Sequence, residues 1–250
     1  MPNLEICVAS PLSIRAAHEG GADRLELCTG LETGGLTPSA GLAEEALACE
    51  VPGGVRALVR PRPGGFVYTP KEVALMVSDI RRFVAMGVDG IVVGALTDRG
   101  DVDVDALRRF IDAADGRGVT FNRAVDLLSD QRSALALFAA EGVDAVLTSG
   151  GYATAAEGSE QLTKLHASSD LTIIAGGGIS VHNVPCVVGT GVPWVHASAS
   201  ELVAGAPSGP GGGSNQYRET KVESVRALRD AIKSREGIHS APSPLRARGS

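Results

Sequence analysis

The sequence predicts an α/β fold, a single (β/α)8 TIM barrel, from three observations. Short apolar, β-branched runs alternate with longer segments of helical periodicity, which is typical of βαβ units around a parallel sheet. Eight such runs can be counted, and eight βα units in about 250 residues is the usual size of this barrel. The first run is followed by "VASPLS", which lacks the glycine-rich fingerprint of a doubly wound open sheet.

The eight apolar runs are the expected strands, in chain order. They cover residues 4–8, 24–28, 55–60, 90–95, 119–125, 145–149, 171–176 and 194–198. The clearest helical pattern between them is "PKEVALMVSDIRRFVAMG", which places Val73, Met76, Val77 and Ile80 on one face.

A short repeat supports the count of eight. "GAD" at Gly21, "GVD" at Gly87 and Gly142, and "GVP" at Gly191 each stand directly before an expected strand. Glycine suits the left-handed backbone at a helix C-cap. The repeat falls before every second strand, and its four occurrences therefore count to eight strands.

One domain is expected over residues 1–239. The segment "AGAPSGPGGGSNQ", at about 204–216, is rich in Gly, Pro and Ser and predicts a flexible loop. Residues 240–250 are expected to form a disordered tail.

Composition excludes several classes of protein. The net charge is −6 with both signs mixed, so no nucleic acid or anionic membrane is expected as a partner. No apolar stretch reaches the roughly 20 residues of a membrane span, and the N-terminus lacks a signal-peptide pattern. Four cysteines in 250 residues do not make a disulfide framework, so thiols in a reducing cytoplasm are expected. The sequence leaves open whether the chain forms a homo-oligomer.

Two similar runs, "LEICVAS" and "RLELCTG", place a glutamate and a cysteine in the same strand phase. Inward side chains alternate with those facing the helices, so Glu5, Cys7, Glu26 and Cys28 are all expected to point into the barrel. The glutamates would occupy a deeper layer and the thiols a layer nearer the mouth. Arg60, at the end of the third strand, is expected to neutralise Glu26, since a buried carboxylate keeps its charge only with a partner.

Other polar residues lie at strand ends, where barrel sites are found. His196 can accept a proton, bind a metal or make a hydrogen bond inside the barrel. In "TFNRAVD", regular pleating allows either Asn122 or Arg123 to point inward, but not both.

The glycines of "AGGGIS" end the seventh expected strand. Gly176, Gly177 and Gly178 are expected to open a helix whose N–H groups bind a phosphate or another anion. A tight turn that needs the conformational freedom of glycine is the alternative.

The inward cysteines have two interpretations. Cysteine often packs as a small hydrophobic residue. As ligands, soft thiolates favour Cu(I) or zinc. A closed zinc site needs four N or S ligands and the sequence has no CxxC, so Cys7 and Cys28 suit Cu(I) better.

Several motifs together resemble the CutC family of copper homeostasis proteins. They are "LEICVAS", "GGADRLELCTGLETGGLTPSAG", "RPRPGGFVY", "GVDGIVVGALT", "VTFNRAVD", "VLTSGG" and "AGGGI". The resemblance implies a cytoplasmic (β/α)8 barrel linked by name to copper tolerance, with Cys7 and Cys28 as copper ligands. The chain departs from the family pattern at Pro63 and Gly65, where an acidic residue is missing, and at Asn122, where a histidine is missing.

Two functions follow as hypotheses. The first is cytoplasmic copper binding, with Cu(I) held by Cys7 and Cys28. The second is an enzyme acting on a small anionic or phosphorylated metabolite. Its candidate catalytic residues are Glu5, Glu26, Arg60 and His196, with Gly176, Gly177 and Gly178 at the anion.

Overall fold

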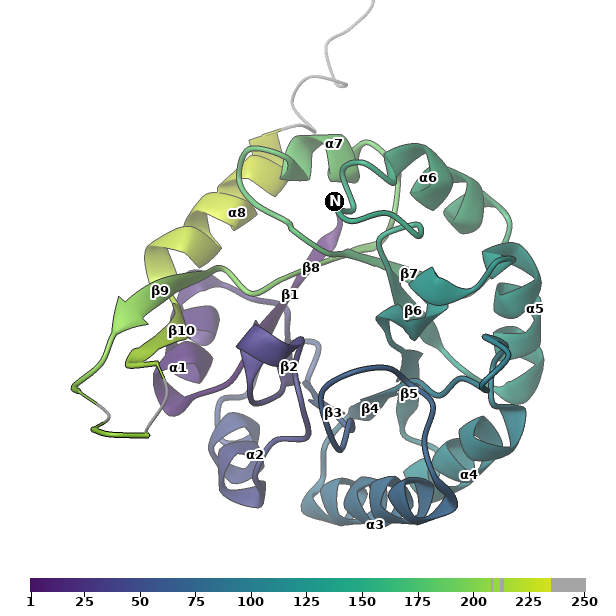
Figure 1. Cartoon of the computed structure of the whole chain (residues 1–250). Coiled ribbons are helices and arrows are strands. Elements are labelled where there is room, and N and C mark those ends of the chain that lie inside the picture. Colours follow the sequence, from purple (N-terminus) through teal and green to yellow (C-terminus); the bar gives the residue numbers. More distant parts are fainter. Residues whose placement is uncertain (208, 212–213, 235–250) are drawn as a thin grey trace, which may run out of the picture.

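The computed structural model describes residues 1–207, 209–211 and 214–234, and it confirms the predicted barrel. Eight parallel strands close in sequence order, and the helices form an outer ring (Figure 1). The strands are β1 (Asn3–Val8), β2 (Arg24–Leu27), β3 (Val55–Leu58), β4 (Gly90–Val93), β5 (Gly118–Phe121), β6 (Ala145–Thr148), β7 (Thr172–Gly176) and β8 (Trp194–Ala197). The tail expected at 240–250 lies outside the described residues.

The helices follow the strands in regular alternation. They are α1 (Pro11–Gly20), α2 (Ala40–Leu47), α3 (Pro70–Met86), α4 (Val104–Ala114), α5 (Gln131–Glu141), α6 (Ser159–Ala167), α7 (Val184–Val188) and α8 (Val222–Ser234), with 3-10 helices η1 (Leu31–Thr33) and η2 (Arg123–Leu127). None of these described helices is long and apolar enough to cross a membrane.

Local signals in the sequence place the helix ends. The α3 helix begins with a capping box between Thr69 and Glu72, and its predicted apolar face is buried. Gly21, Gly87 and Gly142 are left-handed C-caps of α1, α3 and α5, as the repeat predicts. Gly191 also has a positive φ, but it lies in the turn after α7.

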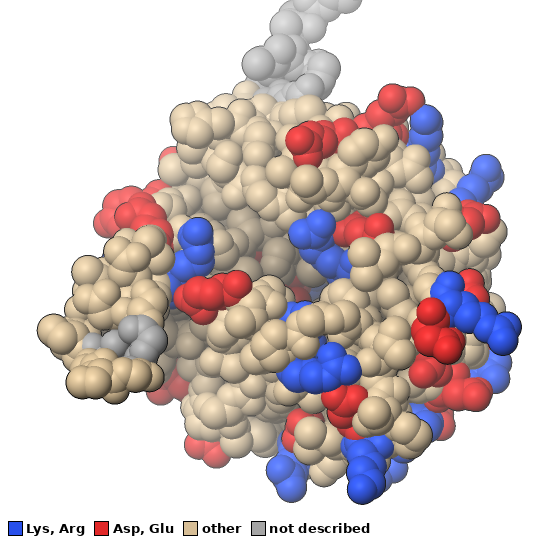
Figure 2. Space-filling view, viewed as in Figure 1, with Lys and Arg blue, Asp and Glu red and all other residues tan. Residues whose placement is uncertain are grey.

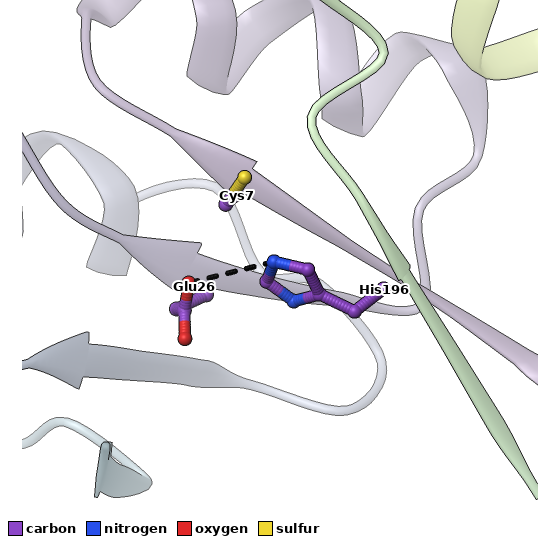
Figure 3. Close-up of side chains that lie close together, drawn as sticks. All are labelled: Cys7, Glu26 and His196. Atoms are coloured by element: carbon purple, nitrogen blue, oxygen red, sulfur yellow. Dashed lines mark ion pairs between the residues drawn. The ribbon is translucent and has the colours of Figure 1, made fainter. Parts of the chain in front are cut away.

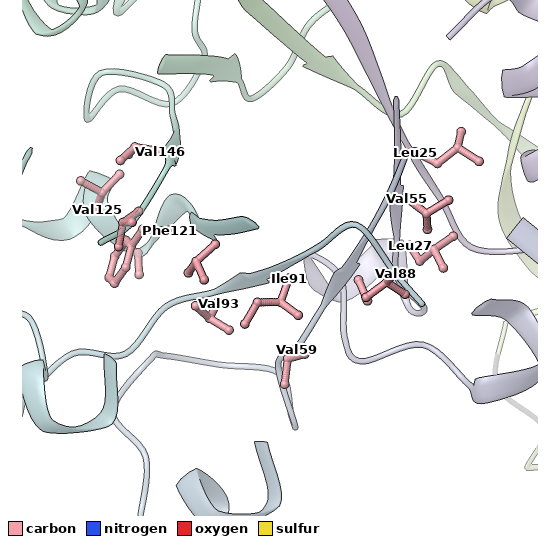
Figure 4. Close-up of a cluster of buried hydrophobic side chains, with 14 of the residues drawn as sticks. Leu25, Leu27, Val55, Val59, Val88, Ile91, Val93, Phe121, Val125 and Val146 are labelled. Atoms are coloured by element: carbon pink, nitrogen blue, oxygen red, sulfur yellow. The ribbon is translucent and has the colours of Figure 1, made fainter. Parts of the chain in front are cut away.

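The main core lies between the strands and the helices. Outward side chains such as Leu25, Leu27, Ile91 and Phe121 are fully buried there (Figure 4). At about 25 cal/mol per Å² of apolar surface, this layer supplies most of the stabilisation of the fold.

The inside of the barrel has two unlike halves. One half is charged. Its side chains project inward from β1 (Glu5), β2 (Arg24 and Glu26), β3 (Arg56) and β8 (His196). The opposite half holds an apolar cluster on β6 and β7. A Cβ atom on Gly90 or Gly118 would lie 3.2 Å and 2.8 Å from the Arg56 guanidinium nitrogens, so these glycines leave the space that this arginine occupies.

A hairpin after β8 was missed by the strand count. Strands β9 (Ser200–Ala204) and β10 (Gln216–Thr220) pair antiparallel beside α1, and the segment predicted as a flexible loop connects them (Figure 1). Its mobility stays a prediction. The base of the hairpin is fixed by buried Glu219, which accepts hydrogen bonds from the Ser10 and Ser13 hydroxyls at the start of α1.

Candidate functional site

A cavity of about 340 Å³ opens at the carboxyl ends of the barrel strands, where sites are found in this fold. Figure 2 shows it as a hollow in the centre of the face in view, with basic and acidic side chains around it. Cys7, Glu26, Cys28 and His196 line it, together with the three arginines Arg60, Arg123 and Arg218.

His196 connects two buried glutamates in this half of the barrel. Its Nδ1 lies 2.7 Å from Glu5 Oε1, and its Nε2 lies 3.7 Å from Glu26 Oε2. Burial lowers the pKa of His196, but the Glu26 charge and the contacts with Cys7 and Glu5 outweigh it. The pKa therefore lies well above 6.5, and the ring carries a proton at neutral pH.

The two glutamates have opposite environments. Burial raises the pKa of Glu5, but the His196 hydrogen bond and the Arg24 charge prevail and hold it at about 2. Arg24 Nε lies 2.5 Å from Glu5 Oε2. Burial raises the pKa of Glu26 to about 7, against the opposing charge of His196. Glu5 is therefore a fixed anion, whereas Glu26 can gain or lose a proton near neutral pH.

The strand register differs from the expected layering of the two repeats. Glu5 is level with Arg24, and Cys7 is level with Glu26. The expectation that both glutamates share one deeper layer is therefore wrong. The stagger between neighbouring barrel strands shifts the second repeat by one inward position.

Cys7, Glu26 and His196 form a group that could hold a metal ion (Figure 3). One ligand atom from each lies within 4.8 Å of the other two. Cys28 is not part of this group. It packs with Cys7, Leu58 and Val92, and its thiol donates to the Val8 carbonyl oxygen at 3.7 Å. Burial, together with the Cys7 charge, raises the pKa of the Cys28 thiol.

The expected Glu26–Arg60 pair is wrong. Arg60 stands two residues beyond the end of β3, whereas Arg56 is the residue level with Glu26. The Arg60 guanidinium instead donates to the carbonyl oxygens of Thr33, Gly35 and Gly64 at 2.6–2.9 Å.

The Asn122–Arg123 alternative is resolved in a way that regular pleating did not anticipate. Strand β5 ends at Phe121, so the next two residues leave the pleat and both line the cavity. The Asn122 side chain caps η2 by accepting from the Ala124 N–H, at the position where this chain lacks the histidine of the family pattern.

The glycines after β7 reach the cavity without opening a helix. Gly177 and Gly178 line it in positive-φ conformations of 110° and 64°. Gly176 ends β7, level with His196. Helix α7 begins only at Val184 and has five residues, so the expectation of N–H groups from a helix start is wrong. The segment forms a tight turn, and binding of an anion there stays a prediction.

Four site residues were missed by sequence reasoning. Arg24 and Arg56 follow the same period-two phase as Glu26 and could have been found by extending it. Asp126 follows β5 by five residues and accepts several hydrogen bonds. Arg218 lies on β10, which no local pattern predicted.

Fold and site together define a (β/α)8-barrel protein with a thiol, a carboxylate, an imidazole and three arginines at the barrel mouth. The CutC family model matches residues 2–201, and the chain belongs to the CutC family.

Relatives and a solved structure agree with this assignment. CutC family proteins of Xanthomonas campestris pv. campestris (strain B100) and Bacteroides fragilis (strain YCH46) are 42% and 39% identical. The alignments cover 90% and 92% of this chain and 96% of each relative. The crystal structure of the "putative copper homeostasis protein CutC" from Streptococcus agalactiae is 30% identical with a TM-score of 0.75, covering 79% of this chain and 99% of that one.

Proposed function

We propose that the barrel mouth binds a small anionic metabolite and transfers a proton to or from it. The observation that carries this proposal is the state of Arg60. Its side chain is buried in the cavity wall, and among the described residues it has no carboxylate partner. A buried charge without a counter-ion is costly, and a bound anion would supply the missing charge.

The floor of the cavity supports proton transfer. Glu26, with its pKa near 7, is matched to general acid–base catalysis at neutral pH. His196, fixed by Glu5, presents a positive ring beside it and would stabilise negative charge that develops on a bound molecule. We place this activity in the cytoplasm, where the four free cysteines stay reduced.

The test is a titration with small phosphates and carboxylates at fixed ionic strength, followed by calorimetry and thermal unfolding. Wild-type protein should bind at least one anion and unfold at a higher temperature with it. Arg218→Met should weaken binding about tenfold, because Arg218 lines the cavity. Arg62→Met is the control, since Arg62 pairs with Glu72 outside the cavity lining. No binding by the wild-type protein rejects the proposal.

Proton transfer is tested on the bound anion itself. In D2O, the wild-type protein should catalyse hydrogen exchange into the bound molecule, detected by NMR. Glu26→Gln should bind it but lose the exchange, because an amide cannot carry the proton. Undiminished exchange in this variant would exclude Glu26 as the acid–base group.

Copper binding is the second candidate, favoured by the Cys7–Glu26–His196 group. Thiolate and imidazole ligands both suit copper. The three arginines in the same cavity disfavour a cation, which is why this function ranks second. Cys28 as the second sulfur ligand stays a prediction, and its thiol must first lose the proton that it donates to Val8.

A Cu(I) titration under reducing conditions, in competition with a chromogenic chelator, separates these ligand sets. About one equivalent should bind the wild-type protein and disappear in Cys7→Ser and His196→Gln. If Cys28→Ser still binds Cu(I), the ligands are the Cys7–Glu26–His196 group. If Cys28→Ser no longer binds Cu(I), Cys28 is a ligand together with Cys7. Cys49→Ser is the matched control. Equal binding by every variant contradicts a copper site here.

A further inference from the structure

Arg123 is held in the cavity wall with one nitrogen unused. Its Nε donates to Asp126 Oδ2 at 2.9 Å, and its Nη2 donates to Ser149 Oγ at 2.9 Å. Its Nη1 donates to no residue that the structure describes, and it lies on the side facing Gly177. One end of the guanidinium is therefore fixed and the other is free to bind.

Asp126 sets this orientation. Its carboxylate also accepts from the Thr148 hydroxyl at 2.5 Å and from the Ser149 and Gly151 N–H groups at 3.1 Å and 3.0 Å. These bonds connect the segments that follow β5 and β6. Because the carboxylate is held from several directions, Arg123 is positioned before any ligand arrives.

The turn after β7 lies against the free end of Arg123. A Cβ atom on Gly177 would lie 3.1 Å from both Cζ and Nη1 of Arg123, so glycine lets the guanidinium lie close against the turn without having to shift. Asn183 fixes the turn by donating to the Gly178 carbonyl oxygen at 2.7 Å and accepting from the Ser180 N–H.

The turn also offers unused backbone donors. Gly178 and Ile179 line the cavity, and their N–H groups reach no acceptor in the described part of the chain. Successive unbonded N–H groups in a glycine turn form a concavity that suits anions. Free donors thus come from two sides, from the arginine and from the turn.

From this arrangement we infer that Arg123 and the 177–179 turn bind the phosphoryl group of a phosphorylated metabolite. This inference rests on the proposed anion binding and names the class of anion. A phosphoryl group presents three terminal oxygens in a tetrahedral arrangement, which can meet donors from both sides, whereas a planar carboxylate is better matched by a single bidentate fork. The rest of the metabolite would extend toward Glu26 and His196, since Gly176 is level with His196.

The test measures inorganic phosphate and acetate binding by calorimetry at fixed ionic strength. The wild-type protein should prefer phosphate. Arg123→Met should lose phosphate affinity tenfold or more, and Arg123→Lys should recover part of it. Asp126→Asn should weaken phosphate binding less than Arg123→Met, because it removes the support and keeps the donor. Arg117→Met is the control, since Arg117 is exposed before β5, at the other end of the barrel.

The outcomes separate this inference from the broader function. If Arg123→Met binds phosphate as the wild-type protein does while Arg218→Met is impaired, the phosphoryl site is wrong and anion binding stands. If the wild-type protein prefers acetate, the phosphoryl assignment is wrong. If it binds neither anion and no other small phosphate or carboxylate, both proposals fail. Circular dichroism spectra confirm that each variant is folded before its affinity is compared.

Discussion

His196 stands between two buried carboxylates whose surroundings move their pKa values in opposite directions. Two cationic partners lower the pKa of Glu5, whereas burial is the largest influence on Glu26 and raises its pKa. Identical side chains on neighbouring strands thus take different protonation states. The difference comes from register, because Arg24 is level with Glu5.

The first prediction concerns the titration of Glu26. Its folded-state pKa of about 7 lies above the ordinary 4.5, so the folded protein holds this proton more tightly than the unfolded chain does. Its contribution to stability is therefore complete below pH 4.5 and declines as the pH rises toward 7. Carbon-13 NMR should show one carboxyl titrating near pH 7 that is absent in Glu26→Gln. A midpoint near 4.5 would contradict burial of Glu26.

The second prediction compares two arginines two residues apart. Arg60→Met should lower the free energy of unfolding by about 3 kcal/mol, because three carbonyl groups, of which that of Gly35 is buried, lose a charged donor. Arg62→Met should cost much less, since its ion pair with Glu72 is solvent-exposed. Urea unfolding of both variants measures the difference. Equal losses would mean that Arg60 does not organise the loops that follow β2 and β3.

At the scale of elements, the β9–β10 hairpin brings Arg218 to the cavity from outside the barrel. Its base is anchored by Glu219 at the start of α1, where the hydroxyls of Ser10 and Ser13 both donate to one carboxylate oxygen. A carboxylate is also favoured at a helix N-terminus by the helix dipole. One buried side chain therefore connects the hairpin to the barrel.

The third prediction tests this anchor. Glu219→Gln should speed amide hydrogen exchange in β9 and β10 and lower the free energy of unfolding by about 1–3 kcal/mol, because the hydroxyls lose a charged acceptor. Glu201→Gln is the matched control, since Glu201 pairs with Glu219 across the hairpin but is exposed. Hydrogen exchange measured by mass spectrometry distinguishes them. Similar exchange in both variants would show that Glu219 is not the anchor.

At the scale of the whole molecule, the barrel interior concentrates its charges in one half. Glu5, Arg24 and His196 form a connected set in which Arg24 also stacks on Trp194, 3.8 Å from the ring centroid. The closure of β1 against β8 creates this set, because it brings residues 5 and 196 level with one another. Closure of the barrel therefore also brings the residues of the site together.

The fourth prediction concerns this charged set. Arg24→Met should lower the free energy of unfolding by about 3–5 kcal/mol, because it removes one of the two cationic partners of the buried Glu5 carboxylate. The pKa of Glu5 is lowered to about 2, so its contribution to stability is present above pH 4.5 and is lost as the pH falls toward 2. Urea unfolding between pH 2 and 6 should show that acidification lowers the free energy of unfolding less in Arg24→Met than in the wild-type protein. The double variant Glu5→Leu/Arg24→Met should be more stable than Arg24→Met. The opposite order would contradict a buried pair.

The sequence by itself determined the barrel, its eight strands and the inward phase of Glu5, Cys7, Glu26 and Cys28. These features follow from local alternation and helix-end signals, which act over a few residues. Only the tertiary structure decided that Glu26 meets His196 and not Arg60, that both Asn122 and Arg123 reach the cavity, and that a hairpin supplies Arg218. Each depends on strand stagger, on where a strand stops, or on a contact between distant segments. Those properties are set by the closure of the whole barrel, and no short stretch of the chain contains them.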